Sequence, residues 1–324
     1  MNLSYKQKLR IAIAGLITGF ILFVFNVATP AIYHAFPNDY VRTKLILDSL
    51  SDKACKPTMV ILGNSRGMSG INGYLLMDDF PREKVYNCCS PSQLLAESAL
   101  FYGRLPNSVK TVIQCIDYRE LDEIAMSLTE GAYTAFGMCN YELDSIARTL
   151  LSSEVIGRLE ESRVERNFRC RTVLKTGVSH CLINCLDDDA PNEQIYNLVY
   201  PYMYPSDRSN TYDRDLEVQN KYVTTDSYHK FTMLDNVRQF FELSRQYFEK
   251  REMRYVLVIM PICPDIKKAT GNREQFPEDV KSALPGFEII DCYTLLDVGD
   301  FYDPIHPNRQ GSVKITKAIS DYLK

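Results

Sequence analysis

Two short motifs near opposite ends of the chain carry side chains that together suit nucleophilic catalysis. Ser65 stands in the stretch Gly63-Asn64-Ser65-Arg66, directly after four apolar residues, and Asp303 and His306 stand in Asp303-Pro304-Ile305-His306. A carboxylate three residues before a histidine can hold Nδ1 while Nε2 takes the proton of a serine hydroxyl. The combination predicts acyl transfer with Ser65 as nucleophile, His306 as general base and Asp303 as the group that orients the imidazole.

Each motif also has a purely structural interpretation. Glycine and asparagine tolerate positive φ and serine caps helices, so the first motif also fits an ordinary strand-to-helix turn. The second fits a turn that starts at Asp303-Pro304 and leads into the last helix. Of the four histidines, His34 borders an apolar run, and His180 and His229 have no motif nearby. His306 is therefore the candidate base.

The elements that must position these residues follow an alternating pattern. Apolar, strand-like runs at 58–63, 84–88, 108–116, 254–261 and 286–293 are separated by helix-like stretches that include 92–105, 233–252 and 309–323. Continuous apolar strands between helices indicate a parallel sheet covered on both faces. We expect a three-layer α/β/α fold with a mostly parallel, flavodoxin-like sheet. Its carboxyl edge would bring the turn at Ser65 and the loop at His306 together.

The chain divides into four parts on this pattern. Residues 1–10 are expected to form a cytoplasmic tail, 11–33 a transmembrane signal anchor, 34–56 a linker and 57–324 the α/β domain. An insertion at about 121–229 interrupts the domain and is first helical, then rich in tyrosine. It is interpreted either as a helical subdomain that adds core or as an aromatic wall that binds an acceptor.

The run at 11–33 contains no charged side chain. As a helix it would span roughly 34 Å, against a hydrocarbon core of about 30 Å. Lys6, Lys8 and Arg10 precede it, so the positive-inside rule places the N-terminus in the cytoplasm and the domain outside. A cleaved signal peptide is the rival interpretation, although its apolar core is usually only about 7–15 residues.

Composition narrows the classes of function. The net charge of −4 gives no reason to expect nucleic-acid binding, and no zinc-finger spacing, Walker loop or dinucleotide-binding glycine motif is present. No cofactor and no metal site are predicted. The ten cysteines are expected to be mostly free, buried thiols, with pairing among Cys170, Cys181 and Cys185 left open.

A serine on the turn after the first strand, combined with Asp-x-x-His before the last helix, resembles the SGNH (GDSL-type) hydrolase superfamily. Gly63-Asn64-Ser65-Arg66 is similar to its first sequence block and Asp303-Pro304-Ile305-His306 to its fifth. The resemblance covers roughly residues 57–120 and 230–324. The apolar N-terminal run looks more specifically like a membrane-anchored subgroup that includes the D-alanine transfer protein of teichoic-acid modification and alginate O-acetylation proteins.

The middle blocks of that superfamily match poorly. The second block should supply a glycine N–H to the oxyanion hole, but here Ser92 or Ser90 falls at that place, after Asn87. The third should supply an asparagine side chain, but the chain has Asp117, whose carboxylate would repel an oxyanion. Either another donor replaces it, Asn64 or an N–H of the insertion, or turnover is slow. Arg66 is either a binding group for an anionic acceptor or a surface residue paired with Asp79 or Glu97.

The resemblance implies a membrane-anchored, extracytoplasmic serine esterase or O-acyltransferase that acts on cell-envelope polysaccharide through an acyl-enzyme. Its partners would be the polysaccharide or an acyl donor, and a multi-spanning membrane acyltransferase. Two alternatives stay open: an SGNH-fold partner of such an acyltransferase that has lost catalysis, and a surface protein that binds polymer through its tyrosines.

Overall fold

The fold is α/β, with one five-stranded sheet in which every neighbouring pair of strands is parallel. The computed structural model describes residues 4–34, 39–117, 121, 123–162, 165, 197–201, 233–269 and 274–324, with backbone alone at 21–22, 24–34, 39, 123–124 and 268–269. The strands are β1 (Met59–Leu62), β2 (Val85–Asn87), β3 (Thr111–Ile116), β4 (Arg254–Ile259) and β5 (Glu288–Asp291). All five lie within the runs that the sequence predicts, which confirms the expectation of a parallel sheet.

The strand order is β2-β1-β3-β4-β5. The chain moves outward from β1 to β2 and then returns past β1 to β3, so the order reverses between β1 and β3. In doubly wound sheets, ligand sites form at this reversal, beyond the carboxyl ends of the strands. Ser65 follows β1 and Asp117 follows β3, so both sequence-predicted positions lie at the reversal.

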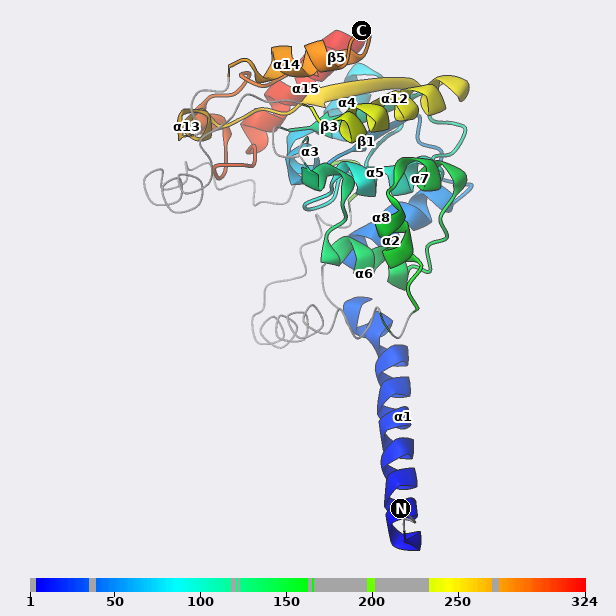
Figure 1. The fold of residues 1–324 in the computed structure, drawn as a ribbon. Helices are drawn as coiled ribbons and strands as arrows, with labels where there is room; N and C mark the ends of the chain where they lie inside the picture. Colours follow the sequence, from blue (N-terminus) through cyan, green and yellow to red (C-terminus); the bar gives the residue numbers. More distant parts are fainter. Residues whose placement is uncertain are drawn as a thin grey trace.

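Helices cover the sheet on both sides, as Figure 1 shows. The strand residues Met59–Leu62 and Val85–Asn87 are buried throughout, which requires cover on both faces. The C-terminal helix α15 packs against α3 and α4, whereas α7 contacts both α5 and α12. The helices are α1 (Tyr5–His34), α2 (Asp39–Ser51), α3 (Ser65–Gly70), α4 (Gly73–Asp79), α5 (Leu95–Tyr102), η1 (Glu123–Met126), α6 (Glu130–Met138), α7 (Ser145–Leu150), α8 (Ser153–Leu159), α12 (Asp235–Lys250), α13 (Pro264–Ala269), α14 (Phe276–Ala283), η3 (Val298–Asp300) and α15 (Arg309–Leu323).

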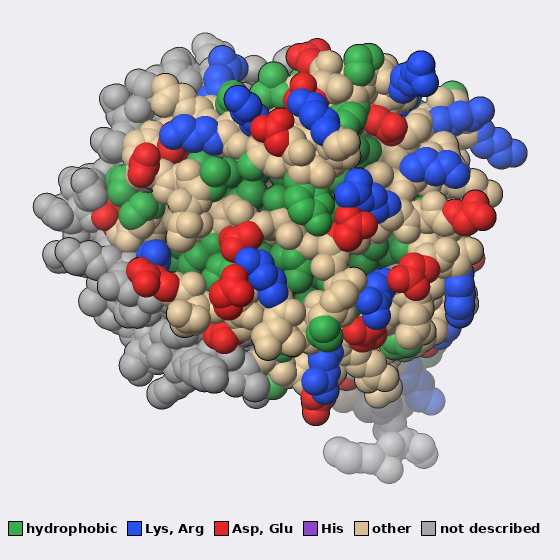
Figure 2. Space-filling model, turned by 90° about the horizontal axis from the view of Figure 1, so that it is seen from above, with side chains coloured by type: hydrophobic (Ala, Val, Ile, Leu, Met, Phe, Trp, Pro, Cys, Tyr) green, Lys and Arg blue, Asp and Glu red, His purple; other side chains and the backbone are tan. Residues whose placement is uncertain are grey.

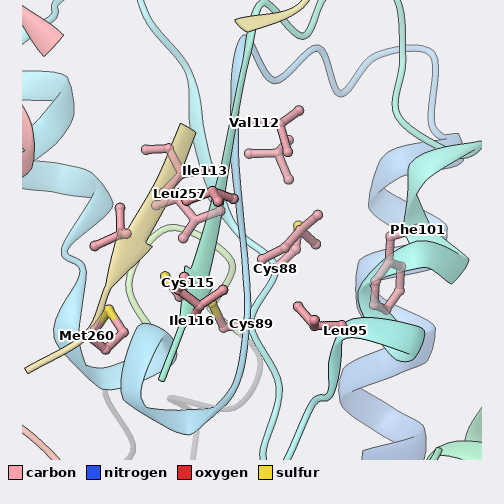
Figure 3. Close-up of a cluster of buried hydrophobic side chains, with 14 of the residues drawn as sticks. Cys88, Cys89, Leu95, Phe101, Val112, Ile113, Cys115, Ile116, Leu257 and Met260 are labelled. Atoms are coloured by element: carbon pink, nitrogen blue, oxygen red, sulfur yellow. The ribbon is translucent and has the colours of Figure 1, made fainter. Parts of the chain in front are cut away.

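The core is continuous across the sheet. Figure 3 shows Val112, Ile113 and Cys115 of β3 gathered with Leu257 of β4, and all four are buried. Seven cysteines are free in the described part of the chain: Cys55, Cys88, Cys89, Cys115, Cys139, Cys263 and Cys292. Five of these are buried, as expected for thiols that pack as small apolar groups. Cys170, Cys181 and Cys185 lie outside the described residues.

The N-terminal helix α1 extends away from the rest of the molecule in Figure 1. Apolar side chains along it are exposed, among them Leu16, Phe20 and Phe23. Within the described residues, no helix combines the length and the apolar character that crossing a membrane requires.

The segment expected to be a linker, 34–56, contains a helix that belongs to the domain. Residues Asp39–Ser51 form α2, which packs against α6 and buries Ile46 and Leu50. The reason is the spacing of its apolar residues, since Ile46 and Leu50 stand four apart and share one face of the helix. The segment that follows α1 is therefore part of the domain.

The first part of the expected insertion is helical, as predicted, and contains η1, α6, α7 and α8. Most of its second part, including His180 and His229, lies outside the described residues. Residues 197–201 return to the domain, where the carbonyl of Leu198 accepts from the N–H of Asn87 and that of Val199 accepts from Gly73. On the face shown in Figure 2, acidic and basic side chains are interspersed without an extended area of either charge.

Candidate active site

The turn between β1 and α3 places Ser65 at the first position of a helix. Gly63 has φ +145°, and a Cβ there would lie 2.6 Å from the Cβ of Cys115. Both the backbone angle and the contact with β3 therefore require glycine. Asn64 is the N-cap of α3, and its Oδ1 accepts a 2.8 Å hydrogen bond from the backbone N–H of Arg66. The turn thus presents a partly exposed Ser65 above a tightly packed strand junction.

The three residues predicted to act together lie in hydrogen-bond contact. The Oγ of Ser65 is 2.8 Å from Nε2 of His306, and Nδ1 of His306 is 2.8 Å from Oδ2 of Asp303. The side chain of His306 is 13% exposed and that of Asp303 is 25% exposed, so the pair is sheltered but open to solvent on one side. This is the geometry in which a serine hydroxyl can pass its proton to an imidazole.

The loop that carries His306 is closed on itself before α15 begins. Phe301 and Pro307 form an isolated antiparallel bridge, and the N–H of Tyr302 donates to the carbonyl of His306. Asn308 caps α15 and also donates from Nδ2 to the carbonyl of Gly299 at 2.8 Å. The loop follows β5, which is an edge strand of the sheet. Because α15 packs on α3, the loop before α15 lies beside the turn at Ser65.

Asp303 is held as a carboxylate by its surroundings. Burial raises the pKa of its carboxyl, but hydrogen bonds from the ring of His306 and from two backbone N–H groups outweigh burial, so the pKa is lowered. The backbone donors are those of Ile305 and His306, which reach Oδ1 at 2.7 and 2.8 Å. An ionised carboxylate only accepts, so Nδ1 of His306 donates to Asp303, and in the neutral imidazole Nε2 is then the acceptor for the hydroxyl of Ser65.

Asp117 forms a buried cluster with the residues on either side of Ser65. Its Oδ2 accepts from Nδ2 of Asn64 at 2.8 Å and lies 3.4 Å from Nε of Arg66. Arg66 and Asp117 are each 3% exposed. The expectation that Arg66 lies at the surface was wrong, because the close approach of β1 and β3 buries it and offers it Asp117 as a partner. The sequence placed Asp117 at this edge but did not reveal its pairing.

The other expected residues are Asn87 at the end of β2 and Ser90 and Ser92 on the loop that follows, and their surroundings differ. Asn87 is fully buried, and its Nδ2 donates to the carbonyls of Gly67 and Ile71, so it fastens α3 to the sheet. We therefore do not assign Asn87 to substrate binding. The N–H of Ser90 donates to the carbonyl of Gly63, whereas Ser92 is exposed and has φ 55°. Ser92 is the residue of this loop that stays a candidate for contact with substrate.

One residue of the surrounding structure was missed by sequence reasoning. Arg42 of α2 is fully buried, and its guanidinium donates to the carbonyls of Asn87, Cys89 and Asn197. Burial lowers the pKa of Arg42 to about 10, so it stays charged at neutral pH. The sequence contained no signal for this role, because Arg42 was one of several charges that follow the apolar run.

No group of three or more His, Cys, Asp or Glu side chains suitable for a metal ion occurs in the part of the chain that the structure describes. No protein-family model matches this chain, and a search of curated proteins finds no similar sequence. The function proposed below is therefore inferred from the geometry of the site and from the two sequence motifs.

Proposed function

We propose that this protein is a serine acyl-esterase or O-acyltransferase of the SGNH type, anchored in a membrane and acting on cell-envelope polysaccharide outside the cytoplasm. The observation that carries the proposal is the connected arrangement of Ser65, His306 and Asp303, with both hydrogen bonds at 2.8 Å. Its position beyond the carboxyl ends of the strands is where parallel α/β sheets place their ligand sites.

The reaction begins when Oγ of Ser65 attacks the acyl carbon of an ester or thioester. Nε2 of His306 takes the serine proton as the Oγ–C bond forms, and it returns a proton to the leaving group as the bond to that group breaks. The acyl group then sits on Ser65. A hydroxyl of the acceptor, or water in an esterase, then attacks the acyl carbon while Nε2 of His306 takes its proton. The bond between the acyl carbon and Oγ breaks, and His306 returns the proton to Ser65. Asp303 keeps the imidazole in the required tautomer and stabilises its charged form.

The oxyanion that forms during each attack needs hydrogen-bond donors close to Ser65. The backbone N–H of Ser65 belongs to the first turn of α3, where N–H groups have no partner within the helix. Ser92 on the loop after β2 is the second backbone candidate, since its N–H requires no glycine. Losing one such donor typically costs about 10²–10³ in kcat.

Anchoring in a membrane is supported by the apolar side chains of α1. Leu16, Phe20 and Phe23 are 75%, 68% and 65% exposed. Covering each with hydrocarbon is worth about 1.5–3 kcal/mol. The basic residues Lys6, Lys8 and Arg10 favour an N-terminus on the cytoplasmic side.

The test is covalent labelling of Ser65. The full-length chain, purified in detergent, is treated with a fluorophosphonate probe alongside the Ser65→Ala variant, and both are assayed with p-nitrophenyl acetate. We expect labelling and turnover in the wild type and neither in the variant. Equal labelling of both, or none of either, would favour the alternative of a partner protein without catalysis.

A further inference from the structure

The cluster of Asn64, Arg66 and Asp117 lies directly beside the candidate nucleophile. Asn64 precedes Ser65 in the chain, and its carboxamide is held at both ends: Oδ1 accepts from the N–H of Arg66 and Nδ2 donates to Asp117, each at 2.8 Å. A carboxamide held at both ends has one orientation. Because the oxygen is bound to the N–H of α3, the nitrogen must face Asp117.

Exposure along the turn shows which way this group opens. Asn64 and Ser65 are partly exposed, whereas Gly63, Arg66 and Asp117 are buried. The amide nitrogen of asparagine carries two hydrogens. The bond to the buried carboxylate uses one of them, so the nitrogen can donate one further hydrogen bond.

We propose that Asn64 supplies a side-chain donor to the oxyanion hole and that Asp117 is the positioning residue that aims it, with Arg66 balancing the charge of Asp117. This inference rests on the proposed function. It assigns to Asp117 a role opposite to the repulsion that its charge alone predicts. The carboxylate contacts the nitrogen of Asn64, so it holds the donor and does not contact the oxyanion.

Arg66 is needed because an isolated carboxylate near a developing oxyanion raises the energy of the transition state. The guanidinium of Arg66 approaches Asp117 to 3.4 Å in surroundings from which water is excluded. The positive charge of Arg66 offsets the negative charge of Asp117, so the pair repels an oxyanion at Ser65 much less than the carboxylate alone would. The hydrogen bond from Asn64 to Asp117 is kept.

The experiment compares variants of the full-length chain in detergent with p-nitrophenyl acetate and with a short-chain alkyl trifluoromethyl ketone. The ketone forms a hemiketal: Oγ of Ser65 bonds to the carbonyl carbon, the serine proton moves to His306, and the carbonyl oxygen becomes an oxyanion. Its affinity therefore reports the oxyanion hole, as kcat does, whereas KM for the neutral ester does not.

Asn64→Ala should lower kcat and the affinity for the ketone by roughly 10²–10³-fold, with little change in KM. The matched control is Asn72→Ala, because Asn72 caps the next helix, α4, through its side chain in the same way. Loss of a helix cap should lower the stability of both variants. Only Asn64→Ala should also lower kcat, because only that variant loses the proposed oxyanion donor.

Asp117→Ala should lower kcat and the affinity for the ketone by about 10-fold or more in the wild-type background and not at all in the Asn64→Ala background. Since that substitution leaves Arg66 buried without this counter-ion, the charge-neutral pair Arg66→Met/Asp117→Leu is made in parallel. This double variant should also lower kcat and the affinity for the ketone when Asn64 is present, and should lower neither in the Asn64→Ala background. It removes the hydrogen bond to Asn64 without leaving a buried charge.

The outcomes separate this inference from the function on which it rests. A wild type with no Ser65-dependent reaction would overturn both. A reactive wild type in which Asn64→Ala behaves like Asn72→Ala, or in which the Asn64 and Asp117 effects on kcat multiply independently, would overturn the role of Asn64 and Asp117 alone.

Discussion

Asp303 uses both of its carboxylate oxygens, each for a separate task. Oδ2 contacts Nδ1 of His306, while Oδ1 accepts the backbone N–H groups of Ile305 and His306. The same side chain therefore shapes the loop and orients the imidazole on it. Substitution of Asp303 should therefore affect both turnover and stability, whereas substitution of Ser65 or His306 should affect mainly turnover.

Ser65→Ala and His306→Ala should each lower kcat for p-nitrophenyl acetate on the order of 10⁴-fold, because each removes a member of one proton-transfer unit. The double variant should be no slower than either single variant, since the second substitution has nothing further to remove. Steady-state kinetics on the three proteins measures this. Effects that multiply in the double variant would show that the two side chains act independently.

Asp303→Asn should lower kcat severely, because the amide favours the wrong tautomer of His306. It should also change how stability depends on pH. The pKa of Asp303 is lowered in the folded protein, so its ionised form stabilises the fold above the unfolded value of about 3.9, and this contribution is lost as pH falls through the folded pKa.

Chemical unfolding from pH 3 to pH 7 tests this. The wild type should be more stable than Asp303→Asn by a constant amount above about pH 5, and the gap should close below about pH 4. Asp291→Asn is the control, because Asp291 pairs with Lys281 at the surface. A gap that stays constant down to pH 3 would contradict the role of the charged form.

At the scale of elements, the turn between β1 and α3 depends on how closely it approaches β3. Gly63 combines a positive φ with a backbone that leaves no room for a Cβ beside Cys115. The carbonyl of Gly63 also accepts from the N–H of Ser90, so this turn is tied to the loop after β2.

Gly63→Ala should lower the free energy of unfolding by about 2–4 kcal/mol and reduce Ser65-dependent turnover, since relief of the contact displaces the turn. Gly157→Ala is the control, because nothing lies within 4 Å of the added Cβ on that exposed helix. That substitution should be neutral or stabilising by about 0.5–1 kcal/mol. Equal stability of the two variants would mean that the junction has room to adjust.

The second element with consequences for the site is α2. Its Arg42 binds the carbonyl of Asn87, the last residue of β2, and that of Cys89 on the loop that leads to Ser92. This helix follows α1 directly, so the part of the domain nearest to the proposed anchor also holds one wall of the candidate site.

Arg42→Met should lower the free energy of unfolding by about 3 kcal/mol, because several buried carbonyls lose a charged donor together. Lys44→Met is the matched control on the same helix, where the pair with Asp48 is exposed and worth less than about 1 kcal/mol. Urea unfolding of both variants provides the comparison. An Arg42→Met protein as stable as Lys44→Met would show that the loop holds its shape without α2.

For the whole molecule, a membrane anchor within α1 would place the N-terminus and the α/β domain on opposite sides of the membrane. The prediction is a single uncleaved anchor at 11–33 with every later residue outside the cytoplasm. A reporter that is active only in the cytoplasm, fused after Lys324, should be silent, and the same reporter fused before Met1 should be active. Strong activity of the C-terminal fusion would contradict the exported domain.

The sequence by itself determined the sheet and indicated which polar side chains lie at its edge. Strands covered on both faces read as mainly apolar runs, and such runs, with a few polar residues among them, marked the positions of all five strands. The spacing of Asp303 and His306 is likewise local, so their mutual contact followed from three residues of chain. The common edge of a parallel sheet then indicated Ser65 as their partner.

Only the tertiary structure decided what charged residues do when their partners are remote in the chain. Arg66 and Asp117 meet because β1 and β3 are neighbours, and Arg42 reaches the loop after β2 because α2 packs into the domain. In the sequence Arg42 looks like an ordinary solvated charge, and neither Arg66 nor Asp117 shows which partner it has. Their burial depends on which surfaces approach, and a local pattern of residue types contains no record of that.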